Sequence, residues 1–184
     1  MPATEITFHL LDGGQAREHA DELRALHAEV YADPPYRLDV DPGVFADRFR
    51  VRSRQPGFVL AEARHGDYLV GYAAGMPLRP STSWWRNLTT PLPQDVTTEA
   101  PGRTFALVDL LVRASWRRQG IGRELHDMVL ARRPEERATL TVLPAAGAAQ
   151  AAFRSWGWRK IGRTQDDDAT LVADLLVASL PIGS

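Results

Sequence analysis

Apolar residues recur with two periods along this chain, and these periods predict strands alternating with helices. Alternation every second residue, or a short unbroken apolar run, indicates strands over seven segments: 6–10, 58–63, 68–75, 105–112, 138–143, 158–163 and 171–177. Apolar residues three and four positions apart indicate helices over four segments: 16–31, 44–54, 120–132 and 145–156. The arginines of the second helix are expected to face water. This order indicates a mixed α/β fold.

Two connecting segments differ from ordinary turns. Residues 78–103 form a long loop with four prolines and the pair Trp84-Trp85, and a loop of that length in a compact domain is usually functional. The two indoles either stack on a substrate ring or close as a lid, or they anchor the loop to the core or to a second copy of the chain in a homodimer. The acidic run Asp166 to Asp168 is expected to be a solvated hairpin turn.

Composition narrows the class of protein. The chain has 184 residues, 44% of them hydrophobic, and a net charge of −1, which indicates one soluble globular domain over residues 1–184. The absence of cysteine excludes disulfides, thiolate metal sites and cysteine nucleophiles. The five histidines lack metal-ligand spacing, so no metal is expected. No basic face for nucleic acid, membrane span or secretion signal is evident, and we expect a cytoplasmic location.

One turn between a strand and a helix carries unusual residues. The stretch WRRQGIGREL, residues 116–125, contains two glycines and three arginines. A helix that begins there points free N–H groups at the turn, which favours an anion. A Walker loop would need lysine after Gly122, and a dinucleotide fingerprint would need glycine at Leu125. The arginines either contact phosphate or form a solvated helix start, whereas two glycines cost about 1 kcal/mol each against alanine and so argue for a ligand.

The pattern Arg117-x-x-Gly120-x-Gly122 after an apolar strand resembles the coenzyme A loop of the GNAT superfamily of N-acetyltransferases. The later stretch AAQAAFRSWGW resembles the superfamily's second signature, with Ala149, Phe153 and Gly157 at motif positions. The resemblance covers nearly the whole chain. It implies the GNAT fold, in which a central, mostly antiparallel, splayed mixed sheet is flanked by helices.

The resemblance also implies acetyl-CoA as cosubstrate and assigns its contacts. Pantetheine would lie between segments 105–112 and 138–143 and pair with the backbone of the first, and the pyrophosphate would sit on N–H groups of residues 118–123. This division fits the chemistry, because an amide-rich arm suits a strand edge and an anion suits a helix N-terminus. The residues expected to bind the cofactor are Leu111, Val112, Arg113, Arg117, Arg118, Gln119, Gly120, Ile121, Gly122, Arg123 and Phe153.

Asp109 is the expected catalytic base, because it takes the place of a glutamate that many superfamily members use. Burial in an apolar strand would raise its pKa and make it a better base. Alternatively, Asp109 pairs with a buried arginine or accepts backbone N–H bonds. The tyrosine that usually protonates the thiolate is Phe153 here, and the motif asparagine is Ala146. The tyrosines that could replace this acid, although packing is favoured for each, are Tyr31, Tyr36 and Tyr72.

The predicted function is acetyl transfer from acetyl-CoA to a primary amine by direct attack in a ternary complex. The acceptor is a small-molecule or peptide amine, recognised by residues 31–42 and 78–103. Side chains that could bind a cationic amine are Tyr31, Asp33, Tyr36 and Asp39. The departures at Phe153 and Ala146 leave an alternative, a non-catalytic acyl-CoA-binding sensor or regulatory module.

Overall fold

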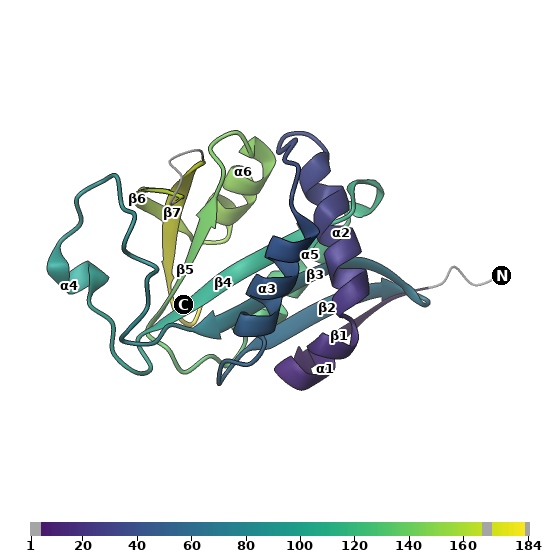
Figure 1. Cartoon of the computed structure of the whole chain (residues 1–184), viewed down its shortest axis with the longest axis horizontal. Coiled ribbons are helices and arrows are strands. Elements are labelled where there is room, and N and C mark those ends of the chain that lie inside the picture. The colour runs from purple at the N-terminus through teal and green to yellow at the C-terminus, as the bar shows by residue number, and fades with distance from the viewer. Residues whose placement is uncertain (1–4, 167–170, 183–184) are drawn as a thin grey trace. The chain divides into compact units, whose positions relative to one another are not determined.

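The computed structural model describes residues 5–166 and 171–182 (Figure 1), and its internal contacts divide the chain into two compact units. The first unit comprises Met1–Met76 and Leu107–Ala131, and the second comprises Pro77–Ala106 and Arg132–Ser184. Strand β4, Thr104–Val112, begins in the second unit and continues into the first. Both units are therefore built from segments that are distant in sequence.

The predicted order of the seven strands is confirmed, whereas the short helix α4 (Gln94–Thr97) lies within the segment 78–103 that was predicted as a loop. The strands are β1 (Ile6–Asp12), β2 (Val59–His65), β3 (Tyr68–Pro77), β4 (Thr104–Val112), β5 (Arg137–Val142), β6 (Arg159–Gln165) and β7 (Val172–Ser179). The helices are α1 (Gly13–Glu18), α2 (Ala20–Ala32), α3 (Pro42–Arg52), α4 (Gln94–Thr97), α5 (Ile121–Leu130) and α6 (Gly147–Ser155), with a single 3-10 turn at Ala114–Trp116. This set of strands and helices covers residues 5–166 and 171–182.

The first predicted helix is in fact two helices. Asp12 caps α1, because its side chain accepts the Gln15 N–H while the Gln15 side chain accepts the Asp12 N–H. This capping box starts the helix at Gly13, three residues before the apolar periodicity begins. His19 then separates α1 from α2.

In the first unit, helices cover both faces of the strands. Strands β1, β2 and β3 pair antiparallel, and α2 and α3 lie side by side over them (Figure 1). Tyr72 of β3 belongs to the core under α2, whereas a Cβ at the adjacent Gly71 would meet Leu125 of α5. Because successive residues of a strand face opposite sides, α5 lies on the other face.

The strands at the centre of the first unit are irregular. The register of β2 with β3 shifts between Ala63 and Arg64. In β4, Val108 and Leu111 both pack against the same core, although a regular strand places residues two or four apart on one face. A three-residue interval therefore indicates a β-bulge at Asp109 and Leu110.

In the second unit, β4 and β5 pair parallel over three residue pairs, from Thr104 with Arg137 to Ala106 with Thr139. Strand β7 pairs antiparallel with both β5 and β6. The hydrogen-bonded order of the whole sheet is β1-β2-β3-β4-β5-β7-β6. The sheet is thus mixed and mostly antiparallel, as predicted.

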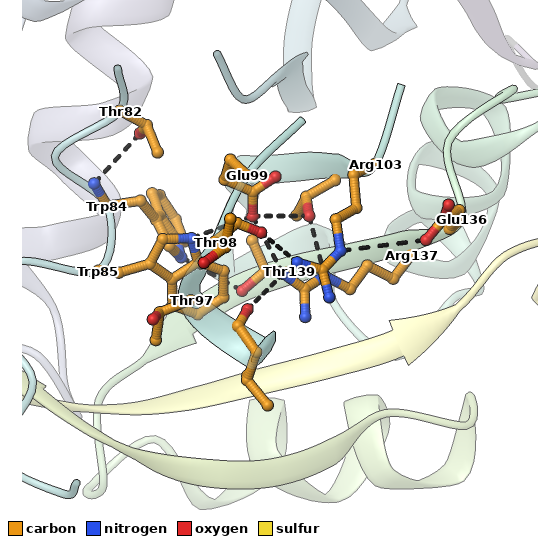
Figure 2. Close-up of polar contacts among 12 residues, drawn as sticks. Thr82, Trp84, Trp85, Thr97, Thr98, Glu99, Arg103, Glu136, Arg137 and Thr139 are labelled. Carbon is orange, nitrogen blue, oxygen red and sulfur yellow. Dashed lines mark hydrogen bonds and ion pairs between the residues drawn. The ribbon is translucent and has the colours of Figure 1, made fainter. Parts of the chain in front are cut away.

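The long loop of the second unit is tied to its own unit by polar contacts (Figure 2). The Trp84 Nε1–H donates to Thr139 Oγ1 (3.3 Å), and the Trp85 Nε1–H donates to Glu99 Oε1 (3.0 Å). The same Glu99 oxygen accepts from Thr104 and from Arg137. The paired tryptophans therefore serve the anchoring role that was one of the two alternatives.

Of the predicted acidic turn, Asp167 and Asp168 lie outside the described residues. Asp166 closes the hairpin, because it exchanges backbone and side-chain hydrogen bonds with Leu171. Within residues 5–166 and 171–182, no helix is both long enough and apolar enough to cross a membrane.

Candidate functional site

The turn between β4 and α5 has a backbone that only certain residues adopt easily. Gly120 is the N-cap of α5 and has φ 84°, in the left-handed region that favours glycine. The first backbone hydrogen bond of the helix runs from the Glu124 N–H to the Gly120 oxygen (3.0 Å). The N–H groups of residues 121–123 therefore precede the helical ladder, and no side chain caps them. The turn therefore offers a set of free backbone donors at the place where the sequence predicts an anion site.

Gly122 has a different reason for being glycine. A Cβ placed there would meet only Val112 Cγ2, at an ordinary contact distance of 3.8 Å. Packing within the described chain therefore does not require glycine at this position. The missing side chain instead leaves open space beside the free N–H groups, which a ligand can approach closely.

The polar side chains of this turn divide between structural and open roles. The Arg117 Nε–H donates to the Val112 oxygen (2.9 Å), which ties the turn to the end of β4. Arg123 pairs with Asp127 (2.7 Å), and Gln119 donates to the Ser115 oxygen. Arg118 has φ 63° and is exposed, and within the described residues it makes no hydrogen bond or ion pair. Of the predicted arginines, Arg118 has the most freedom to reach a phosphate.

Residues at the end of β4 are already bonded within the first unit. The Arg113 N–H donates to the Val70 oxygen, and the Arg113 oxygen accepts from Trp116. Its guanidinium donates to the Leu69 oxygen and pairs with Glu29. Arg113 therefore fixes β4, and its predicted contact with pantetheine stays a prediction, as do those of Leu111 and Val112.

Asp109 lies on β4 at the bulge and is half-buried. Within the described residues its carboxylate has no hydrogen bond and no ion pair, so neither structural alternative from the sequence is found. Desolvation raises the pKa of Asp109 to about 6, while the charges of Arg52 and Arg48 act to lower it. A carboxylate with that pKa is unprotonated at neutral pH and can accept a proton.

Three tyrosines accompany Asp109 in the first unit. Desolvation raises the pKa of Tyr31 and of Tyr72, and the charge of Asp109 raises both further. The rings of Tyr31 and Tyr36 pack at 4.9 Å between centroids. Desolvation also raises the pKa of Tyr36, whereas the charge of Arg117 lowers it. The charge of Asp109 thus acts on Tyr31 and that of Arg117 on Tyr36, while the role of residues 31–42 in acceptor binding stays a prediction.

Two buried polar atoms near this group have no partner in the described structure. They are the Tyr72 Oη, on a side chain that is 1% exposed, and the His27 Nδ1. The His27 ring packs against Tyr31 at 4.6 Å and against Phe45 at 4.7 Å. Desolvation lowers the pKa of His27 to about 4, so its ring is neutral at pH 7. Buried polar groups in folded proteins nearly always have a partner, so these two atoms are available to a water molecule or a ligand; sequence reasoning did not single out His27.

The prediction that the α3 arginines face water is wrong for Arg52. Helix α3 buries Phe45, and Arg52 follows it by seven residues, which returns it to within about 20° of Phe45 around the helix. Arg52 is half-buried for this reason, while Arg48 is exposed. The seven-residue spacing between Phe45 and Arg52 could have predicted this burial. The large number of arginines in the helix led us instead to expect that all of them face water.

Phe153 lies on α6 of the second unit and is buried. Its ring makes edge contacts with Trp156 and Trp158 at 5.6 and 5.9 Å between centroids. Ala146, at the motif's asparagine position, is also buried and precedes the helix without a side-chain cap. Both residues pack as hydrocarbon and offer no proton.

The structure shows no group of three His, Asp or Glu side chains that could hold a metal ion, as far as residues 5–166 and 171–182 are concerned. The site is therefore one of backbone donors, one carboxylate and several hydroxyl groups. Such a set suits an anionic ligand at the α5 turn and proton transfer at Asp109.

The fold is similar to that of several solved acetyltransferase structures. The structure matches an acetyltransferase of the GNAT family from Staphylococcus aureus Mu50 with TM-score 0.68 and 16% identity, over 96% of this chain and 99% of that one. It matches a ribosomal-protein-alanine N-acetyltransferase from Brucella melitensis with TM-score 0.64 and 18% identity, over 95% and 99%. It also matches a PaiA N-acetyltransferase from Thermoplasma acidophilum, solved with coenzyme A, with TM-score 0.59 and 10% identity, over 95% and 99%.

No curated protein sequence matches the chain. The sequence model of the acetyltransferase (GNAT) family, however, matches residues 18–158. This range includes α2, the β4–α5 turn and α6, and it spans most of the chain. The protein therefore belongs to the GNAT family of acetyltransferases, which transfer an acyl group from acyl-CoA.

Proposed function

We propose that the protein transfers the acetyl group of acetyl-CoA to a primary amine by direct attack in a ternary complex. The observation that carries this proposal is the unpartnered carboxylate of Asp109, whose pKa lies near 6. It belongs to the same unit as the open helix start at Gly120. A base and an anion site are the two parts that this reaction requires of the chain.

The free N–H groups of residues 121–123 would bind the pyrophosphate of the cofactor. Gly122 leaves room for the phosphates, and Arg118 adds a positive charge that no described residue neutralises. Coenzyme A in the Thermoplasma acidophilum relative supports this choice of cofactor. Phe153 would contribute only apolar contact with the pantetheine arm, since it is a buried hydrocarbon.

The proposed reaction forms one bond and breaks one. The amine nitrogen attacks the thioester carbonyl carbon, the C–N bond forms, and the C–S bond breaks. The proton of the amine passes to the Asp109 carboxylate, directly or through one water, and then to solvent. The coenzyme A thiolate leaves without a strong acid, because a thiol with pKa of about 8–9 is a good leaving group, and water protonates it afterwards.

Titration calorimetry with coenzyme A, followed by thiol release from acetyl-CoA with a panel of amines, tests the proposal. We expect binding, and we expect turnover with at least one primary amine. Asp109→Asn should lower kcat by about 100-fold or more, the usual contribution of a general base, with coenzyme A affinity unchanged. Unchanged turnover in the variant at neutral pH would remove Asp109 from the mechanism.

The absence of a proton donor at Phe153 favours one second candidate, a non-catalytic acyl-CoA-binding module. Binding of coenzyme A without turnover on any amine of the panel would establish that alternative. No binding at millimolar coenzyme A would contradict both functions.

We also propose that the two units form one catalytic domain, since the family match spans segments of both. The acceptor is a small-molecule or peptide amine. The Brucella melitensis relative is named for a ribosomal protein substrate, which supports a peptide amine as one of the candidates. Cytoplasmic location and homodimer formation stay predictions.

A further inference from the structure

Helix α3 directs two arginines toward the side that it buries. Taking about 100° per residue, Arg52 and Arg48 lie about 20° and 60° from Phe45 around the helix. Phe45 contacts the His27 ring of α2, and Phe49 belongs to the same packed face. Both arginines therefore lie near the α2–α3 contact, and their charges act on His27 of α2.

Neither arginine has a counter-ion among the residues that the structure describes. Within the described residues, Arg48 and Arg52 make no hydrogen bond and no ion pair. By contrast, Arg50 of the same helix pairs with Asp47 at 3.0 Å on the exposed side. Arg52 is half-buried and so loses hydration without gaining a partner, whereas Arg48 is exposed and keeps its hydration. Such an arrangement is favourable when a ligand supplies the anion.

The same two arginines act on the groups around the proposed base. Their charges oppose the upward shift of the pKa of Asp109 and contribute to the low pKa of His27. Arg52 also acts on Tyr72, whose buried hydroxyl has no partner. This part of the first unit thus combines two cations with one carboxylate, and it retains unused hydrogen-bonding atoms for a ligand.

Resting on the proposed function, we propose that the acceptor amine also carries a carboxylate, which Arg48 and Arg52 bind while its amine faces Asp109. The two arginines exceed the single negative charge of Asp109 by one. An acceptor that brings one anionic group neutralises this excess. The unpartnered Tyr72 hydroxyl is a further donor for it.

The chemistry of the transfer is unchanged by this assignment. The amine nitrogen replaces sulfur on the acetyl carbon, the amine proton goes to Asp109, and the thiolate takes a proton from water. The product is an N-acetylated carboxylic acid. Its carboxylate keeps its charge throughout, so the arginines act in binding and orientation.

The experiment compares pairs of acceptors that differ in the anion, with kcat/KM calculated from the concentration of unprotonated amine in each. Amino acids are tested against the matching amino-acid amides, and short peptides with an acidic residue against their amidated forms. We expect kcat/KM to favour the carboxylate by at least tenfold, in the range of one charge-assisted hydrogen-bonded pair. Free amino acids and acidic peptides are separate arms, so the size of the acceptor is read from the same data.

In Arg52→Gln and Arg48→Gln, the ratio of kcat/KM between the carboxylated acceptor and its amide should fall toward one. The main cause should be a higher KM for the carboxylated acceptor. Arg50→Gln is the matched control on α3 and should leave the ratio unchanged. Titration of the N-acetylated product onto wild type and Arg52→Gln measures the same contact without turnover, and the variant should bind it more weakly.

The outcomes separate the two proposals. Acetylation of both members of each pair at equal kcat/KM, or a preference for the amides, would overturn this inference alone. A carboxylate preference that survives in both arginine variants would do so as well. The absence of turnover with every amine would overturn the proposed function, and this inference with it.

Discussion

Replacing Asp109 by asparagine changes the stability of the protein in a way that depends on pH. Burial raises the pKa of Asp109 from the ordinary value of 3.8 to about 6. The folded protein therefore holds this proton more tightly than the unfolded chain does. Below pH 4 the carboxyl is neutral in both states, and its charge costs nothing. As the pH rises through 6 the charged form appears in the folded state, and stability is lost.

The two pKa values set the size of the effect. They differ by about 2, and each pH unit corresponds to about 1.4 kcal/mol, so the full cost above pH 7 is about 3 kcal/mol. Asparagine has nearly the same shape and no charge. Relative to wild type, Asp109→Asn should therefore gain about 3 kcal/mol between pH 4 and pH 7. For a chain of this length this corresponds to about 6–12 °C in Tm.

Urea unfolding of the wild type and of Asp109→Asn between pH 4 and pH 8 measures this gain in stability. The difference between their free energies of unfolding is plotted against pH. The change across the range is the informative quantity, because a constant offset reports only the altered packing of the amide. Asp39→Asn, which removes an exposed carboxylate of the same unit, should change stability by less than about 0.5 kcal/mol. A difference curve for Asp109→Asn that is flat would refute the desolvation of Asp109, and with it the reasoning that makes this residue a base.

Further predictions follow from the same contacts. The kcat/KM of the wild type should rise with pH through about 6, and Arg52→Gln should move this rise to higher pH, because the charge of Arg52 lowers the pKa of Asp109; a limb that stays in place would contradict the coupling. Gly71→Ala should cost about 1–3 kcal/mol in thermal unfolding, since its Cβ would lie 2.8 Å from the Leu111 oxygen. Trp85→Phe should cost about 1–3 kcal/mol in urea unfolding, because a carboxylate that is 1% exposed loses a donor; no loss would show that the indole bond does not hold the long loop.

The order of elements could be predicted from the sequence because it depends on local periodicity. Apolar alternation identified the β2–β3 hairpin, and the glycines identified the start of α5. Glycine is present at these two positions for different reasons, which only the structure distinguishes. Gly120 has a positive φ, whereas Gly122 is unconstrained by its neighbours.

The surroundings of Asp109 could not be predicted in the same way. His27 and Arg52 belong to helices that are distant from β4 in sequence, and their role depends on how those helices pack. The β4 bulge likewise follows from which residues reach a shared core, since Val108 and Leu111 look unremarkable in a continuous apolar run. The helical period does place Arg52 on the same face of α3 as Phe45. The helix as a whole is polar, however, and this general character hides the one arginine that lies on the buried face.

The open space at Gly122 means that a substitution there can block ligand binding without destabilising the fold, which allows a test in living cells. Alanine at this helical position meets only one methyl group at contact distance, and it favours the helix by about 0.5–1 kcal/mol. The same methyl group would stand where the proposed pyrophosphate would approach the free N–H groups. Gly122→Ala should thus yield an allele whose protein accumulates at least as well as the wild type yet binds no coenzyme A. Any phenotype of that allele would report the lost chemistry alone, without the fall in abundance that complicates a deletion or an unstable variant.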